Sequence, residues 1–415
     1  MARIVIAAFG TRGDVAPLTA IGVRLRAAGH EVAVTAPSEF AELIGGCGLR
    51  CIPHDIDLGI EVDMSDVDPR KAAMKLLSPG GMRETGDTLL AALHDEPADV
   101  LLLSPFAELA GHPLAQARGI SSAGVRMQPL STTAQHPPAI LGPWSAGALL
   151  NRAAGRFATA ALDRMYAGTV RSFRDKLGLP KVSARRLRRR RTEAGWPILY
   201  GYSPSVSPRP ADWRPGIDVV GYWWPPRPDG WQPPPEVVSF LAAGEPPVFL
   251  SFGSLVMAKV ESARLSALVP EALRKAGVRG IVQAGWAGLS VESDDVLTIG
   301  DLPHDWLFER VAAVVHACGA GTTGAGLRAG LPAVAIPEPT GDQPFWARRL
   351  AHLGVSAATL SRRKLTADGL AAAIGTALTE PAHRDNAKQV AATLAAEDGA
   401  GRAVATVERL AAAQL

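Results

Sequence analysis

Cysteine is scarce in this sequence. Its 415 residues include three, Cys47, Cys51 and Cys318, an odd number without the regular spacing of a disulfide framework. So few thiols are typical of proteins kept in a reducing compartment. We therefore predict a cytoplasmic protein without disulfide bonds.

Long apolar runs and a strong net charge are absent as well. No stretch of about 18 apolar residues occurs, and the amino terminus becomes polar too soon for a secretion signal. The formal net charge of +3 is too small for a chain of this length to make nucleic acid the expected partner. With 47% apolar and 20% charged residues the composition is that of a globular protein, and the length predicts two domains with a cleft between them.

The chain opens with the pattern of a strand, a glycine-containing loop and a helix. Residues 3–8 form an apolar run, residues 15–28 are amphipathic with a helical period, and residues 31–36 alternate as a second strand. A strand, a helix and a strand in this order predict a parallel sheet. Further strands are expected at residues 100–104 and 122–127, and helices at residues 82–94 and 151–177.

A stretch rich in proline, tryptophan and glycine, residues 201–247, interrupts this pattern. Its composition is unsuited to a helix and predicts an extended connection between domains. Strands and helices then alternate again, which predicts a second doubly wound sheet. The expected strands are residues 248–251, 280–283, 296–299, 313–316 and 333–336, and the last helices are residues 366–378, 383–397 and 401–413.

The strongest chemical signal is the segment 316–324, with the sequence HACGAGTTG, directly after an apolar strand and at the start of a helix. Free backbone N–H groups and the positive end of the helix dipole form an anion site that suits a diphosphate. His316 is placed to donate a hydrogen bond to a phosphate oxygen and so to stabilise a leaving group. The alternative is a glycine turn beside a core histidine.

Two more polar positions follow predicted strands. Asp342 and Gln343 set a carboxylate beside an amide at the carboxyl end of a parallel strand, where they suit the vicinal hydroxyls of a sugar. Asp14 follows the first strand, where a carboxylate can take the proton of an attacking hydroxyl. For both aspartates the alternative is a helix cap. The loop before Asp14 lacks the G-x-G-x-x-G spacing, so NAD is not expected.

Taken in order, the motifs resemble those of the sterol glucosyltransferases and the related actinobacterial natural-product glycosyltransferases. The resemblance spans nearly the whole chain. It rests on residues 9–17 (FGTRGDVAP), 202–213, 219–223, 285–289 (GWAGL), 300–308 (GDLPHDWLF), 316–323, 341–346 (GDQPFW) and 397–399 (EDG).

This resemblance implies an α/β fold of the GT-B type, in which two Rossmann-like doubly wound domains face a central cleft. We expect an acceptor-binding domain over residues 1–215, a linker over 216–245, a nucleotide-sugar domain over 246–395, and a last helix over 396–415 that returns to the first domain. The implied activity is inverting transfer of a hexose from a UDP- or dTDP-sugar to a hydroxyl of a lipophilic acceptor, such as a polyketide, a macrolide or a sterol. No metal or other cofactor is expected, and the protein is predicted to be a monomer or a homodimer.

The resemblance also assigns roles to residues. Asp14 is the expected catalytic base and His316 the contact to the donor phosphate. The remaining expected donor contacts are Gly319, Gly321, Thr322 and Thr323 at the diphosphate, Asp342 and Gln343 at the sugar, and Ser254 and Trp286 at the nucleoside, with a packed indole as the alternative for Trp286. The expected acceptor contacts are Phe106, Met127 and Trp144, which an ordinary apolar core explains as well.

One departure from the family pattern concerns the phosphate loop. The family commonly has HHGGAGTT, whereas Ala317 and Cys318 stand here in place of the second histidine and the first glycine. Cys318 is either a reactive site or an inert buried thiol. A catalytically silent partner that only binds a nucleotide sugar or a lipophile, and a nucleotide-sugar epimerase, are the alternatives to a transferase.

Two charged segments have no role in this scheme. The Asp-x-Asp triplets at residues 55–57 and 66–68 suit either a divalent metal or a solvated acidic loop. The arginine-rich run at residues 185–191 suits either a weak contact with an anionic membrane surface or a solvated loop.

Overall fold

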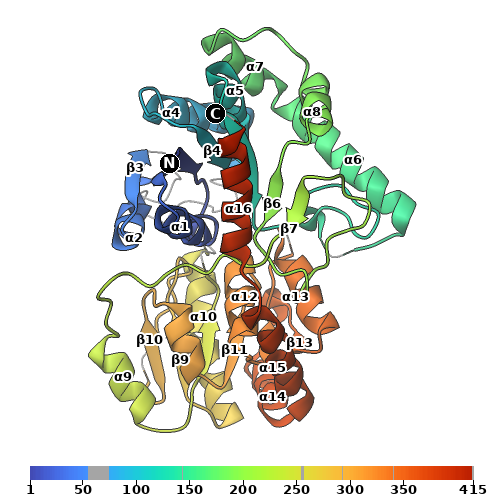
Figure 1. Cartoon of the computed structure of the whole chain (residues 1–415). Coiled ribbons are helices and arrows are strands. Elements are labelled where there is room, and N and C mark those ends of the chain that lie inside the picture. Colours follow the sequence, from blue (N-terminus) through green and yellow to red (C-terminus); the bar gives the residue numbers. More distant parts are fainter. Residues whose placement is uncertain (55–73, 143, 254–256, 292, 340, 414–415) are drawn as a thin grey trace.

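The computed structural model of the chain describes residues 1–54, 74–142, 144–253, 257–291, 293–339 and 341–413. Two α/β domains lie one above the other, each built on its own parallel sheet (Figure 1). This arrangement confirms the predicted two-domain α/β fold. In the described ranges no helix combines the length and the apolar composition needed to cross a membrane.

The first domain contains a seven-stranded sheet in the order β3-β2-β1-β4-β5-β6-β7, with every neighbouring pair parallel. Its central strand β4 has the sequence VLLL, and all four residues are buried because helices cover both faces of a parallel sheet. The strands are β1 (Arg3–Ala7), β2 (Glu31–Pro37), β3 (Arg50–His54), β4 (Val100–Leu103), β5 (Ser121–Arg126), β6 (Ile198–Tyr200) and β7 (Ile217–Val219). The helices are α1 (Arg12–Ala27), α2 (Ala41–Gly46), α4 (Pro79–Ala92), α5 (Glu108–Arg118), α6 (Ala148–Met165), α7 (Ala167–Lys176) and α8 (Ala184–Glu193), with short 3-10 turns η1 (Ser38–Phe40) and η2 (Ala139–Leu141).

The second domain contains a six-stranded parallel sheet in the order β10-β9-β8-β11-β12-β13. The strands are β8 (Val248–Ser251), β9 (Gly280–Gln283), β10 (Val296–Ile299), β11 (Ala313–His316), β12 (Ala333–Ala335) and β13 (Ser356–Thr359). The helices are α9 (Pro235–Ala242), α10 (Lys259–Ala276), α11 (His304–Leu307), α12 (Ala320–Arg328), α13 (Gln343–His352), α14 (Ala367–Thr379) and α15 (Pro381–Ala395), with 3-10 turns η3 (Phe308–Arg310) and η4 (Arg362–Lys364). The last helix, α16 (Gly399–Ala412), returns to the first domain.

The strand order reverses once in each sheet, between β1 and β4 in the first domain and between β8 and β11 in the second. Loops diverge at such a reversal and leave a crevice at the carboxyl ends of the strands, where open α/β sheets bind ligands. The loop after β1 leads into the first turn of α1, which carries Asp14, and the loop after β11 consists of residues 317–319. Helices α1 and α12, which follow these loops, contact each other across the domain interface. Both crevices therefore open toward the same interdomain cleft.

The structure differs from the predicted elements in the connection between the domains. Residues 201–247 contain α9, which begins at Pro235, because a proline at the start of a helix gives up no hydrogen bond. They also contain β7, whose Ile217 and Val219 are buried against β6, so the first sheet extends beyond the expected boundary at residue 215. The prediction of an extended stretch was therefore wrong at α9, whereas β7 is extended but belongs to the first sheet.

A second difference concerns residues 151–177, predicted as one helix. They form α6 and α7, with Tyr166 at the break. The buried Tyr166 hydroxyl donates to the Leu77 carbonyl at 2.7 Å, which ties the break to the segment before α4. The periodicity of the sequence could not predict this break, because the contact joins residues 89 positions apart.

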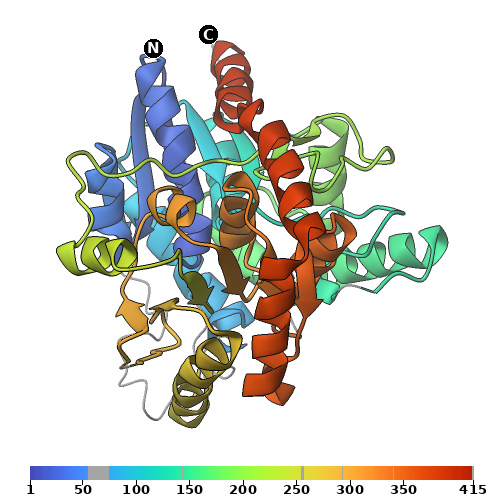
Figure 2. The same ribbon diagram turned by 90° about the horizontal axis from the view of Figure 1, so that it is seen from below.

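The chain crosses between the domains twice, and the two crossings touch. Helix α15 packs on α12 in the second domain, whereas α16 packs along α1, β4 and β5 in the first (Figures 1 and 2). At the start of α16, Gly399 lies directly against the backbone of Gly221 and Tyr222 in the other crossing. The Ser203 hydroxyl donates to Glu397 at 2.6 Å beside this contact. The contact between the crossings thus fixes one domain against the other.

We expect Gly399→Ala to lower the free energy of unfolding by about 2–3 kcal/mol, because its Cβ would overlap backbone atoms that cannot turn aside. Gly375→Ala in α14 is the matched control, since its Cβ would meet open space and alanine favours the helix by about 0.5–1 kcal/mol. Urea unfolding measures both variants. Equal stability of the two would show that the crossings are not in tight contact.

Candidate active site

The turn between β1 and α1 is held in one shape by glycine and by a bond to the neighbouring strand. Gly10 has φ +125°, and a side chain there would overlap the Asp14 carboxylate. The Phe9 amide donates to the Ser104 hydroxyl at 3.0 Å, just past β4. The turn after β1 is therefore tied to the end of β4 at the reversal point of the first sheet, and the Asp14 carboxylate lies against Gly10 in this turn.

Asp14 is the third residue of α1 and closes a capping box. Its Oδ2 accepts hydrogen bonds from the Thr11 amide at 2.9 Å and from the Thr11 hydroxyl at 3.3 Å. Burial raises the pKa of the Asp14 carboxyl, and hydrogen bonds from Thr11 and Gln128 oppose the rise. The helix begins at Arg12 and not at Val15 as predicted, so the expected loop is shorter and Asp14 belongs to the first helical turn.

The second domain places Asp342 opposite. Asp342 is the N-cap residue of α13, but its carboxylate makes no capping bond and instead accepts from the Trp346 indole N–H at 2.8 Å. Burial, with a contribution from the charge of Asp14, raises the pKa of Asp342 to about 6. The two carboxylates, one from each domain, are thus close enough to interact electrostatically across the cleft.

Gln343 is oriented by its own loop. Its side-chain oxygen accepts from the Glu338 amide at 2.8 Å, which leaves the NH₂ group to donate elsewhere. The side chains of Asp342 and Gln343 are both partly exposed. An acceptor and a donor therefore stand side by side at the carboxyl end of β12.

His316 ends β11 and is 2% exposed. Its Nδ1 accepts from the Cys318 amide at 3.1 Å, so the neutral ring carries its proton on Nε2. Burial and the charge of His304 lower the pKa of His316 to about 4. At neutral pH His316 is therefore an uncharged hydrogen-bond donor through Nε2, which has no hydrogen-bond partner among the described residues.

The loop after His316 opens the N-terminus of α12 to the cleft. Gly319 is the N-cap, and a Cβ at Gly319 or Gly321 would meet no atom within 4 Å. Thr322 is partly exposed, whereas Thr323 is buried and its amide bonds to the Gly319 carbonyl. Gly319, Gly321 and Thr322 are therefore accessible from the cleft, whereas Thr323 is buried below the loop. The Thr323 hydroxyl has no hydrogen-bond partner among the described residues.

Cys318 has φ 63°, and no other non-glycine residue in the described ranges has a positive φ. It occupies the position where the resembling family has glycine. Its side chain is fully buried, and burial raises the pKa of the thiol far above its usual range. The structure therefore favours the inert buried thiol, because solvent does not reach the sulfur and both burial and the nearby Asp342 disfavour the thiolate.

Trp286 lies after β9, and its amide donates to the Gly253 carbonyl at 3.3 Å. The indole is partly exposed and stacks on no other ring among the described residues. Ser254, the other residue expected near a nucleoside, lies outside the described residues. A partly exposed indole therefore lies beside Gly253 at the carboxyl edge of the second sheet.

A polar chain that we did not predict from the sequence links the two sheets. Ser251 donates to the Gln283 side-chain oxygen at 2.7 Å, and Gln283 donates to Asp301 at 2.7 Å. Asp301 in turn lies 3.4 Å from Arg12, the first residue of α1. The position of Gln283 as the last residue of a predicted strand was the available signal.

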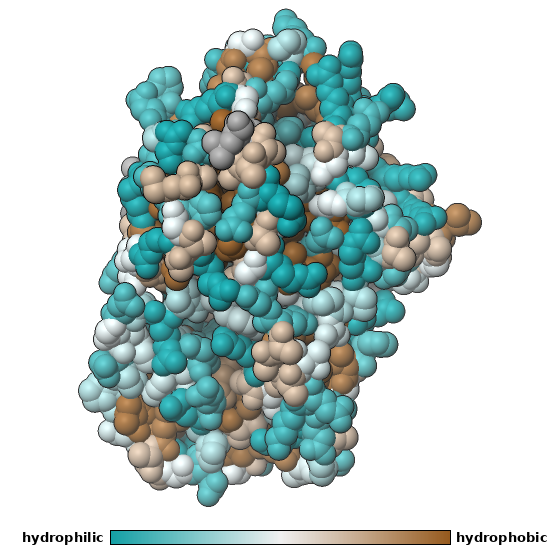
Figure 3. All heavy atoms as spheres, in the orientation of Figure 1, coloured by the Kyte–Doolittle hydropathy of each residue, from teal (hydrophilic) through white to brown (hydrophobic). Residues whose placement is uncertain are grey.

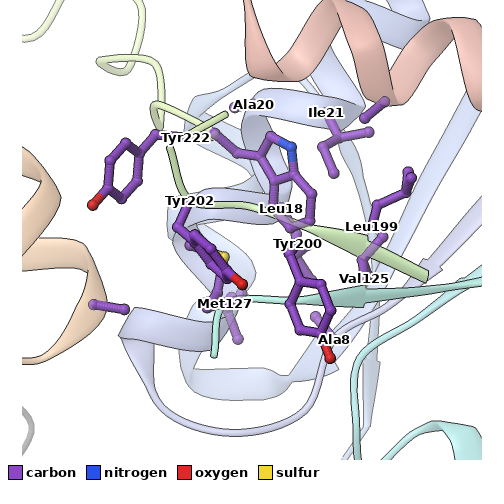
Figure 4. Packing of buried hydrophobic residues seen from close by; sticks show 14 of the residues in the cluster. Ala8, Leu18, Ala20, Ile21, Val125, Met127, Leu199, Tyr200, Tyr202 and Tyr222 are labelled. Carbon is purple, nitrogen blue, oxygen red and sulfur yellow. The ribbon is translucent and has the colours of Figure 1, made fainter. Parts of the chain in front are cut away.

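The three residues expected at the acceptor do not share one environment. Phe106 and Trp144 are 40% and 42% exposed, and Phe106 follows β4 at the same sheet edge as Asp14. Met127 is 5% exposed and belongs to the core cluster that also contains Tyr200 and Tyr202 (Figure 4). Met127 therefore packs in the core beside these tyrosines, and its role as an acceptor contact stays a prediction.

No three His, Cys, Asp or Glu side chains within the described ranges gather as metal ligands would. Both Asp-x-Asp triplets, at residues 55–57 and 66–68, lie outside those ranges.

Solved structures with the same architecture identify the fold class. The chain superimposes on the glycosyltransferase of kitacinnamycin with a TM-score of 0.70 and 19% identity over 99% of both chains. It superimposes on the glycosyltransferase VinC, solved in complex with dTDP, with a TM-score of 0.67 and 19% identity, again over 99% of both chains. Two facing doubly wound domains with opposed carboxylates and an open helix N-terminus thus define a GT-B protein.

Sequence relatives identify the family. Residues 4–84 match the glycosyltransferase family 28 N-terminal domain, and residues 282–410 match the erythromycin biosynthesis protein CIII-like C-terminal domain. The O-mycaminosyltylonolide 6-deoxyallosyltransferase of Streptomyces fradiae is 33% identical over 98% of this chain and 97% of its own length. Two sterol 3-beta-glucosyltransferases of Arabidopsis thaliana are 31% and 30% identical, and the chain spans 64% and 68% of their lengths. The chain belongs to this glycosyltransferase family, which confirms the resemblance and excludes the epimerase alternative.

The raised pKa of Asp342 predicts a pH-dependent cost to stability. A folded-state pKa of about 6 means that ionised Asp342 destabilises the fold at neutral pH, and that this cost disappears as the pH falls below the ordinary carboxyl range. We expect Asp342→Asn, which keeps an acceptor for Trp346, to raise the free energy of unfolding by about 1–2 kcal/mol near pH 7.5 and by much less near pH 4.

Urea unfolding at both pH values measures this effect, with the exposed Asp385→Asn on α15 as the control. A gain that is the same at both pH values would contradict the electrostatic explanation.

Proposed function

We propose that the cleft binds a UDP- or dTDP-sugar on the second domain and a lipophilic acceptor on the first, and that the sugar moves to an acceptor hydroxyl with inversion. The observation that carries this proposal is the approach of Asp14 to Asp342 across the cleft, beside the N-terminus of α12. A base from one domain and a sugar contact from the other then meet at one point.

On the donor side, we propose that the amides of the α12 N-terminus and His316 Nε2–H bind the diphosphate. The lowered pKa supports this role, because a neutral ring with Nδ1 already occupied donates only through Nε2. The space above Gly319 and Gly321 suits close approach of phosphate oxygens. The Asp342 carboxylate and the Gln343 NH₂ group suit adjacent sugar hydroxyls, and Trp286 offers a face to the base.

On the acceptor side, we propose Asp14 as the general base. Its raised pKa makes the carboxylate more basic than an exposed one, and its place at the reversal point of the first sheet faces the donor domain. Exposed Phe106 and Trp144 are the candidate apolar contacts.

The proposed reaction is a single displacement. The acceptor oxygen forms a bond to the anomeric carbon while the bond from that carbon to the phosphate oxygen breaks. The hydroxyl proton passes to Asp14, and the charge of the departing nucleoside diphosphate is taken up by His316 and the α12 amides. One displacement inverts the anomeric carbon.

The names of the relatives support these substrate classes. The Streptomyces fradiae enzyme is named for transfer of a deoxyhexose to a macrolide, and the Arabidopsis thaliana enzymes for transfer of glucose to sterols. VinC was solved with a thymidine diphosphate. A location in the cytoplasm and a monomeric or dimeric state stay predictions.

Asp14 has two candidate roles, base and helix cap, and two substitutions separate them. Asp14→Asn keeps an oxygen that can accept from Thr11 but removes the base, so we expect kcat to fall at least 100-fold with nearly normal stability and donor affinity. Asp14→Ala should lose both activity and about 1 kcal/mol of stability. Near-normal kcat in Asp14→Asn would leave Asp14 with the capping role only.

His316→Ala should lower kcat/KM by about 10²–10³, since one preorganised donor to the leaving group is removed. Because the pKa of His316 is about 4, the ring is neutral across the working range, and we expect the acid limb of the pH profile to come from the cleft carboxylates Asp14 and Asp342, whose pKa values are raised. That limb should survive in His316→Ala. Kinetics of the exposed His352→Ala serve as the control, and loss of the limb in His316→Ala would contradict this assignment.

The function is tested directly by mass spectrometry of reactions containing UDP-glucose or dTDP-glucose, EDTA, and a panel of sterols, macrolides and aromatic polyketides. A glycosylated product in EDTA supports metal-independent transfer. Donor binding without any product across the panel would favour the silent-partner alternative, and turnover that requires Mn²⁺ would contradict the proposed phosphate site.

A further inference from the structure

Helix α6 projects from the first domain and exposes an apolar stripe. Leu149, Leu150 and Phe157 are 82%, 58% and 77% exposed, and Ala153, Ala160 and Ala161 are exposed on the same side of the helix. Figure 3 shows apolar atoms at the tip where α6 stands out from the molecule, next to hydrophilic side chains. Exposed phenylalanine and leucine at helical spacing are not covered by any described part of the chain, so the stripe faces outward.

A strong positive charge lies next to this stripe. Residues 148–193, which form α6 to α8, contain thirteen Lys or Arg and three Asp or Glu, a net charge of +10 in a chain whose total is +3. Helix α8 turns four arginines to solvent on one side, around a surface hollow of about 480 Å³ that Glu193, paired with one of them, also lines. These are Arg185, Arg186, Arg189 and Arg190.

The two features form one surface. Arg188, on the inner side of α8, is paired with Asp163 of α6, and the two helices are in contact. Arg152 and Arg156 flank the apolar stripe on α6 itself. A helix with leucine and phenylalanine on one side and arginine beside it is the type that lies in the headgroup region of a bilayer.

We infer that α6 and α8 form a docking surface for an anionic lipid bilayer, with the arginines on headgroup phosphates and the stripe of Leu149, Leu150 and Phe157 among the acyl chains. A second copy of the chain fits this surface less well, because a symmetric contact would bring two regions of charge +10 together. A nucleic acid would use the arginines but leave the apolar stripe in water.

The segment that precedes α6 connects the docking surface to the interdomain cleft. The segment before α6 contains exposed Ile140, Leu141 and Trp144, and its turn η2 contacts α13 of the second domain. If the proposed function is right, a protein docked on a bilayer through α6 would take up a membrane-dissolved acceptor at the end of the cleft where η2 contacts α13. This step alone rests on the proposed function.

Vesicle sedimentation tests the surface. We expect the wild-type chain to bind vesicles containing about 30% phosphatidylglycerol and not vesicles of phosphatidylcholine, because each arginine near an anionic surface adds to the attraction. The fourfold variant Arg185→Gln, Arg186→Gln, Arg189→Gln and Arg190→Gln should bind at least tenfold more weakly. The double variant Leu149→Ser and Phe157→Ser should lose at least tenfold as well.

Two matched controls change the same chemistry elsewhere. Exposed Val260 and Val238, replaced by serine, should leave vesicle binding within about twofold of wild type. So should four exposed arginines on other faces, each replaced by glutamine: Arg83, Arg274, Arg363 and Arg402. Turnover of a water-soluble acceptor should be unchanged in all variants, and vesicle binding does not depend on whether the proposed function is right.

Several results would overturn the proposal. The proposal fails if the wild-type chain does not bind anionic vesicles, or if it binds neutral vesicles equally well. It also fails if the control variant with four arginines replaced on other faces loses as much vesicle binding as the α8 variant. A wild-type dimer that Phe157→Ser converts to a monomer would assign the stripe to a second copy. Binding of a polynucleotide that needs the four arginines but not Phe157 would assign the surface to nucleic acid.

Discussion

The interdomain site depends on one constraint, the contact between the two chain crossings. Each sheet can form its own crevice, but neither crevice holds all of the polar groups. The backbone contact between Gly399 and Gly221, with Glu397 held by Ser203 beside it, sets the direction in which the two sheets face. The Arg12 to Asp301 pair then closes the interface at the site itself. A small rotation at the crossings would separate Asp14 from Asp342.

The electrostatics of the cleft follow from this enclosure. Burial raises the pKa of both carboxyls and lowers that of His316, so each group is biased toward its neutral form in the absence of substrate. The neutral imidazole is suited to donate to an incoming phosphate, and the carboxylates are more basic than exposed ones. The same low polarity that costs stability at Asp342 therefore strengthens each hydrogen bond that a donor sugar would make.

The left-handed backbone of Cys318 orients the side chain of His316. A left-handed residue between His316 and the N-terminus of α12 directs the Cys318 amide back to Nδ1 and fixes the imidazole tautomer. Glycine would adopt this conformation without strain. The cysteine keeps the loop shape, because its thiol is buried away from the cleft and bonds to the His316 carbonyl at 3.6 Å. The cysteine side chain therefore lies in the core beneath the loop, while the surface at Gly319 and Gly321 is open.

The sequence by itself determined the two parallel sheets, the strand ends that carry Asp14, His316 and Asp342, and the family, because local periodicity and short motifs record where strands end and which groups follow them. It left the cap and base roles of Asp14 open, since both use the same residue type at a helix start. It could not distinguish buried Met127 from exposed Phe106, nor find the Gln283 to Asp301 link. The tertiary structure decided the burial of Met127 and the Gln283 to Asp301 link, together with the facing of the two carboxylates and the joining of α6 to α8. Each depends on residues far apart in the chain, whose contacts no local pattern encodes.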